Sequence, residues 1–161
     1  ASVLRLERDR GRAWKLKRMT HDTRGPRSVL LSADEKTLYV ADGDAERGDQ
    51  CQLCAYPVKR DGGIGPCKVL LAFAPAERGV EGMCLDSEGN LIACAGWKKG
   101  GVGPMVYVIT ASGTILETHP APADTPMRCA FGDAVLSSLY LTAGDGGLYR
   151  ATNTGRRGLQ R

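Results

Sequence analysis

The sequence predicts an all-β fold in which antiparallel sheets form about three consecutive blades of a β-propeller. Two observations lead to this prediction. Short apolar runs separated by Gly, Asp, Ser and Pro follow one another through all 161 residues, and one two-strand pattern occurs three times. No segment has the sustained 3.6-residue periodicity of an amphipathic helix. The expected architecture is therefore an arc of small β-meanders.

The repeated unit consists of a short apolar strand, a polar turn and a second strand that ends near glycine. It occurs as PRSVLLSADEKTLYVADGD at 26–44, as VEGMCLDSEGNLIACAGW at 80–97 and as PMRCAFGDAVLSSLYLTAGD at 126–145. A polar turn between two β-rich runs is typical of a β-hairpin. Each copy is therefore expected to supply the first two strands of one blade.

Alignment of the three strand starts places Arg27, Glu81 and Arg128 in one column. The intervals are 54 residues (27 to 81) and 47 residues (81 to 128). Internal periods of this length are typical of one propeller blade each. The three side chains are therefore expected at equivalent places in neighbouring blades.

Two further strand candidates follow each of the first two repeats and complete a four-stranded meander. They are QLCAYPVKR (52–60) and CKVLLAFA (67–74) after the first repeat, and PMVYVIT (104–110) and TILETHP (114–120) after the second. Residues 3–19 are predicted to form the two outer strands of a preceding blade, and residues 147–153 a third strand of the last one. The chain thus contains two whole blades and pieces of about one more.

Composition places the chain among globular proteins and excludes several functions. Hydrophobic residues make up 42% and charged residues 25%, and the formal net charge is +4. The positive excess lies at the two ends without interleaved aromatic residues, so we expect solvated surface charge and no nucleic-acid partner. No apolar run approaches the roughly 18 to 20 residues of a membrane span. The compartment stays open between the cytoplasm and, after removal of a signal, the periplasm or the exterior.

The six cysteines do not follow a metal-binding pattern. Cys51 and Cys54 form a CxxC, but this segment is predicted as a strand, in which residues three apart point to opposite faces. A zinc ribbon requires a second close pair. The remaining four are scattered singly along the chain: Cys67, Cys84, Cys94 and Cys129. Buried free thiols are therefore the leading interpretation, with a disulfide or a metal as alternatives.

Several motifs together resemble the C-terminal half of the gluconolactonase, regucalcin and luciferin-regenerating-enzyme family. They are GPRSVLLSADEKTLYVADGD, QLCAYPVKRDGGIGP, RGVEGMCLDSEGNLIACAGW, GPMVYVITASGTILETHPAP and TPMRCAFGDAVLSSLYLTAGDGGLYR, in order over about residues 2–157. The resemblance implies a six-bladed propeller, of which residues 1–161 form one half-propeller domain. It also implies a divalent cation (calcium, zinc or manganese) at one mouth of the channel. There the cation polarises a lactone carbonyl while a carboxylate assists the attacking water.

The resemblance implies a role for each residue of the aligned column. Family members usually read Pro-Asn-Gly, with Asn as a metal ligand, where this chain has PRS with Arg27. They carry an acidic ligand, most often Asp, at the position of Glu81, which becomes the candidate metal ligand and catalytic general base. They often carry Asn in a Pro-Thr-Asn motif where this chain has PMR with Arg128. A further acidic ligand comes from the family's N-terminal half, which this sequence does not include.

Two of these three positions have the wrong chemistry for a metal site. An arginine has five N–H donors, no acceptor lone pair and a permanent positive charge, so Arg27 and Arg128 would repel a cation. The local field favours an anion, or an ion pair with Glu81. The sequence therefore predicts an altered or degenerate metal site, in which Arg27 and Arg128 are candidate groups for binding a substrate or an anion.

Three functions remain open at this point. The first is a sugar-lactone hydrolase with a rebuilt site, in which two copies form a homodimer that completes six blades and takes a lactone or an acidic sugar. The second is a non-catalytic binding or scaffold propeller that also dimerises and binds an anion. The third is an inactive truncated remnant of a longer lactonase. Dimerisation is expected because an open arc of three blades leaves apolar faces exposed at both ends.

Overall fold

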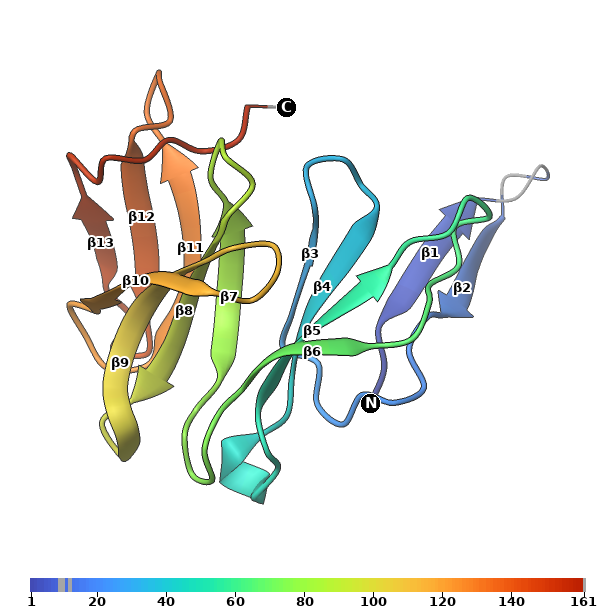
Figure 1. Cartoon of the computed structure of the whole chain (residues 1–161), viewed down its shortest axis with the longest axis horizontal. Helices are drawn as coiled ribbons and strands as arrows, with labels where there is room; N and C mark the ends of the chain where they lie inside the picture. The colour runs from blue at the N-terminus through green and yellow to red at the C-terminus, as the bar shows by residue number, and fades with distance from the viewer. Residues whose placement is uncertain (9–10, 12, 161) are drawn as a thin grey trace.

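The computed structural model describes residues 1–8, 11 and 13–160. Antiparallel strands form four sheets that succeed one another along an open arc (Figure 1). The first sheet is an N-terminal hairpin of β1 (Leu4–Arg8) and β2 (Trp14–Arg18). It corresponds to the outer strands predicted over 3–19, of which residues 9, 10 and 12 lie outside the described part. The predicted all-β, partial propeller is confirmed.

Three blades follow the N-terminal hairpin, each with its strands paired in chain order. The first blade contains β3 (Ser28–Leu31), β4 (Thr37–Asp42), β5 (Gln52–Pro57) and β6 (Lys68–Ala72), with a short 3-10 helix at Ala45–Arg47. The second blade contains β7 (Val80–Leu85), β8 (Leu91–Trp97), β9 (Gly100–Ile109) and β10 (Ile115–Pro120). The third blade contains β11 (Pro126–Gly132), β12 (Ser138–Ala143) and β13 (Leu148–Ala151).

The core lies between the blades, and β8 shows why its sequence is a continuous apolar run. On one face, Leu91, Ala93 and Ala95 pack in the cluster shared with the first blade. On the other face, Ile92 and Cys94 pack in the cluster shared with the third blade. Because successive side chains of a strand alternate in direction, a strand covered on both sides needs apolar residues at every position.

The first strands of the blades, β3, β7 and β11, lie side by side, with β7 in the middle. Gly82 allows the close approach of β7 and β11, because a Cβ at this position would lie only 2.8 Å from Cα of Arg128. Any larger residue would force the two strands apart. The starts of the three strands therefore lie close together on the inner side of the arc.

The two ends of the arc expose apolar side chains. In the N-terminal hairpin, Leu6 pairs with Leu16 and Arg8 with Trp14, so these residues share one face. Leu6, Leu16 and Trp14 are all more than half exposed. At the other end, Leu148 of β13 is 70% exposed. No helix among the described residues is long and apolar enough to cross a membrane.

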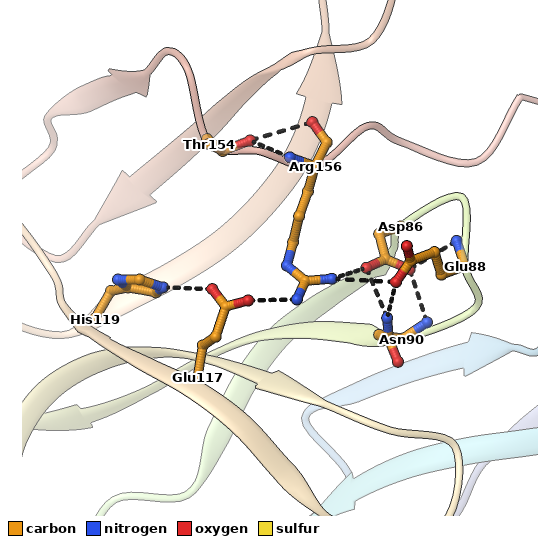
Figure 2. A network of polar contacts seen from close by, with 7 residues as sticks. All are labelled: Asp86, Glu88, Asn90, Glu117, His119, Thr154 and Arg156. Atoms are coloured by element: carbon orange, nitrogen blue, oxygen red, sulfur yellow. Dashed lines mark hydrogen bonds and ion pairs between the residues drawn. The ribbon is translucent and has the colours of Figure 1, made fainter.

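The C-terminal segment after β13 turns back and fastens the third blade to the second. Arg156 bonds Asp86 at 2.6 Å and also pairs with Glu117 of β10, as Figure 2 shows. The other carboxylate oxygen of Glu117 lies 2.9 Å from His119 Nε2. These hydrogen bonds, that to Arg156 first, lower the pKa of Glu117. We name Asp86, Glu117 and Arg156 the tail clamp.

Candidate channel-mouth site

The predicted site residues lie where the inner strands of the three blades begin. Arg27 immediately precedes β3, Glu81 is the second residue of β7, and Arg128 is the third residue of β11. Because β7 is flanked by β3 and β11, side chains from all three segments can reach one place. The structure brings the three predicted residues together around Glu81.

Glu81 is a buried carboxylate held between two arginines. Its exposed fraction is 2%, and it occupies a β-bulge, so it has no paired residue on β8. Arg78 Nε lies 2.7 Å from Oε1. Arg27 Nη1 lies 3.3 Å from Oε1 and 3.4 Å from Oε2. Both oxygens of the carboxylate therefore have a guanidinium partner, as a buried charge requires.

Arg27 connects Glu81 to the loop after β4. Its Nη2 lies 2.7 Å from Oδ1 of Asp44, and its Nε donates to the carbonyl of Gly43 at 3.2 Å. Partial burial acts to lower the pKa of Arg27, but the attraction of Glu81 and Asp44 outweighs it and raises the pKa. The guanidinium therefore stays charged, and the predicted ion pair between Arg27 and Glu81 forms.

Arg78 belongs to the site although the repeat alignment did not include it. Its side chain is only 12% exposed, its Nη1 lies 3.4 Å from Glu46, and its guanidinium lies 5.3 Å from the ring centre of Trp97. This cation–π contact fixes the side chain over the end of β8. The sequence signal was the segment RGVE, in which an arginine precedes Glu81 by three residues.

Arg128 lies beside Glu81 in a different way. Its Nη1 donates to the backbone carbonyl of Glu81 and, at 2.9 Å, to that of Met127. Among the described residues, no carboxylate forms an ion pair with Arg128, and the residue is exposed. It therefore presents an uncompensated positive charge next to the buried carboxylate.

The strand register corrects the predicted column in the third repeat. In β7 the bulge falls at Glu81, between Val80 and Gly82. In β11 the bulge falls at Met127, and Arg128 pairs with Thr142. By strand register, Met127 is therefore equivalent to Glu81 and Arg128 to Gly82, so Arg128 lies one residue further along its strand than the alignment of strand starts placed it.

The residues present do not fit a divalent cation. Calcium, zinc and manganese need several oxygen, nitrogen or sulfur donors around one point. The described residues contain no group of three or more His, Cys, Asp and Glu side chains that could hold a metal ion. Both Glu81 oxygens already bind guanidinium groups, and Arg27 supplies positive charge where an acceptor would be needed.

A second feature of the channel side is an apolar groove at the opposite ends of the inner strands. Its volume is about 690 Å³, and its walls include Leu31 of β3, Leu85 of β7 and Phe131 of β11. Cys84 also lines it. The groove does not include Glu81 or either of its arginine partners, so it is separate from the charged cluster.

A propeller arc with a charged cluster at the start of its inner strands defines the class of this protein. The family described as the SMP-30/gluconolactonase/LRE-like region matches residues 1–145. The chain belongs to this family, as its motifs predicted. No curated protein matches the sequence significantly.

Solved structures of the same class share the fold. A luciferin-regenerating enzyme is 20% identical with a TM-score of 0.70, over 90% of this chain and 50% of its own. A gluconolactonase from Xanthomonas campestris is 27% identical with a TM-score of 0.69, over 92% and 43%. A calcium-binding regucalcin from Agrobacterium tumefaciens is 21% identical with a TM-score of 0.68, over 91% and 51%. The chain thus spans about half the length of these relatives.

Proposed function

We propose that this chain is the substrate-binding half of a gluconolactonase-like sugar-lactone hydrolase whose channel-mouth site is rebuilt around arginine. The observation that carries the proposal is Arg128, an exposed guanidinium that lies against buried Glu81 and has no carboxylate partner among the residues that the structure describes. Family membership supports the lactone class of substrate. The 27% identity to a gluconolactonase supports it further.

The chemistry assigns different tasks to the two sides of the cluster. Arg128 would bind the carboxylate of a sugar acid or the carbonyl oxygen of a lactone, because a guanidinium donates two parallel hydrogen bonds to such groups. Negative charge that develops on the carbonyl oxygen would be stabilised by the same donors. Glu81 would accept a proton from the attacking water, for which its contact with Arg27 must loosen.

The test is hydrolysis of glucono-1,5-lactone by the purified chain, followed by proton release at constant pH. We expect turnover above the spontaneous rate, no response to added calcium, zinc or manganese, and a fall of at least tenfold in Glu81→Gln. Glu35→Gln is the matched control, since Glu35 is an exposed carboxylate remote from the cluster. Turnover that survives Glu81→Gln unchanged would remove Glu81 from the mechanism.

A second candidate function, a non-catalytic binding module, is favoured by the two arginines that already bind the Glu81 carboxylate. A carboxylate fixed between Arg27 and Arg78 is a poor general base, so the same site would serve a non-catalytic module that binds a sugar acid through Arg128. This candidate predicts no turnover in the hydrolysis assay. In a thermal melt it predicts that gluconate raises the melting temperature, and that this increase is lost in Arg128→Gln. If the chain shows neither turnover of the lactone nor stabilisation by gluconate, the interpretation as an inactive remnant is the one that remains.

The homodimer is part of this proposal. Exposed apolar residues at both ends of the arc support it, because a propeller blade normally buries both faces against neighbours. Two copies around a two-fold axis would place two Glu81 clusters around one channel.

A further inference from the structure

Two cysteines from neighbouring blades lie in contact, further along the inner strands than the charged cluster. Cys84 is on β7 and Cys129 is on β11, and their Sγ atoms are 3.7 Å apart although the residues are 45 positions apart in sequence. The close approach of the two strands at Gly82 brings them together. All six cysteines are free thiols in this structure.

We propose that Cys84 and Cys129 are an oxidisable pair, which a small organic disulfide converts into a disulfide bond between the second and third blades. The Sγ contact requires only a modest side-chain rotation to reach bonding geometry, because the strands that carry the cysteines are already adjacent. The pair is independent of whether the channel-mouth site hydrolyses a lactone.

The oxidant reaches the pair through Cys84. This residue lines the 690 Å³ groove, whereas Cys129 bonds the carbonyl of Ile92 at 3.3 Å. The Cys84 thiolate attacks one sulfur of the organic disulfide, forms a mixed disulfide and releases one thiolate. The Cys129 thiolate then attacks Cys84 Sγ and releases the second. Two protein thiols lose two electrons, the oxidant becomes two thiols, and the two protons pass to the released thiolates.

A third cysteine lies nearby but is a poorer partner. Cys94 on β8 is 0% exposed, and it does not line the groove.

The pKa of the Cys84 thiol is raised, first by its hydrogen bond with Cys129 and then by burial. The first attack should therefore be slow at neutral pH and faster in alkaline solution.

The disulfide would fix the geometry of the channel-mouth site. Cys129 directly follows Arg128, and Cys84 follows Glu81 by three residues on the same strand. A covalent bond between these cysteines would hold the Arg128 guanidinium against the Glu81 carbonyl. The redox state of the pair would therefore control how far the second and third blades can separate at this end.

The experiment exposes the reduced chain of residues 1–161 to cystamine at pH 8.5. Free thiols are then counted in denaturant, and linked peptides are identified by mass spectrometry after trypsin and Glu-C digestion. Cleavage after Glu88 separates Cys84 from Cys94, so the linkage is unambiguous. We expect the thiol count to fall from six to four, a Cys84–Cys129 linked peptide, and a melting temperature higher by roughly 5 °C that reduction reverses.

Variants provide the controls. Cys84→Ala and Cys129→Ala should each abolish the link, whereas Cys54→Ala should retain it. If an alanine variant does not fold, the peptide map of the unmodified chain still decides. A count that stays at six, or a link that joins Cys94 to Cys129, would overturn the proposal.

Discussion

At the scale of single residues, Glu81 governs the site because it is a charge without access to water. A carboxylate with an exposed fraction of 2% must be neutralised within the protein. Arg27 does this from the segment before β3 and Arg78 from the loop before β7, and both side chains are largely buried. The cluster is therefore structural as well as a candidate binding site.

Loss of Arg78 should destabilise the chain strongly. Arg78→Met leaves buried Glu81 with a single cationic partner, and we expect the free energy of unfolding in urea to fall by about 3 kcal/mol. The double variant with Glu81→Gln should recover most of this loss, because the unpaired charge is then gone. Arg47→Met is the control: its pair with Asp44 is largely exposed, and its change should stay below about 0.5 kcal/mol. Equal losses at Arg78 and Arg47 would contradict the assignment.

The sequence was sufficient for some of these residues and insufficient for others. Glu81 and Arg27 were found because the repeat carries them to the starts of adjacent strands. Arg78 was missed because it lies in the loop before β7, outside the repeat. Arg128 lies one residue further along its strand than the alignment placed it, because an alignment of strand starts does not reveal which residue occupies the bulge.

At the scale of elements, the segment after β13 acts through the tail clamp. Arg156 joins the turn after β7 to β10, so a short irregular stretch holds two blades by charge. The sequence did not predict this contact, since a single arginine in GRRGLQR has no periodic signal. By contrast, the strands of the two whole blades were predicted because each one is a short apolar run bounded by turn residues.

The tail clamp should make stability depend on pH. The pKa of Glu117 is lowered from its ordinary value of 4.5 in the folded chain, so its pair with Arg156 stabilises the fold above that pH. The stabilisation is lost as pH falls through the lower folded pKa. We therefore expect Arg156→Gln to melt at a lower temperature than the parent at pH 7, and the difference in melting temperature to narrow towards pH 3. Thermal melts followed by circular dichroism measure this difference.

Arg60→Gln serves as the control for the tail clamp, because Arg60 is exposed and forms no ion pair within the described part of the chain. Its melting temperature should follow that of the parent at every pH. A gap for Arg156→Gln that is independent of pH would mean that Glu117 contributes little.

At the scale of the whole molecule, the arc is open and its two end faces differ. The N-terminal hairpin presents Leu6, Leu16 and Trp14 on one face. The third blade presents Leu148 together with polar residues. The chain also spans only about half the length of the larger relatives whose fold it shares.

We expect the purified chain to be a dimer in solution, because association would cover these faces. Light scattering over a concentration range should give about twice the 17.2 kDa of one chain. Leu16→Glu should shift the mass towards one chain, whereas Val102→Glu, at an exposed site away from the hairpin, should not. A single-chain mass at all concentrations would contradict the homodimer.

The second blade has a consequence for how the chain unfolds. Since β8 buries one face against the first blade and the other against the third, neither neighbour can separate without bringing apolar side chains into water. The three blades are therefore not independent modules. They form one cooperative unit that melts in a single transition. A substitution at either interface therefore changes the melting temperature of the whole arc.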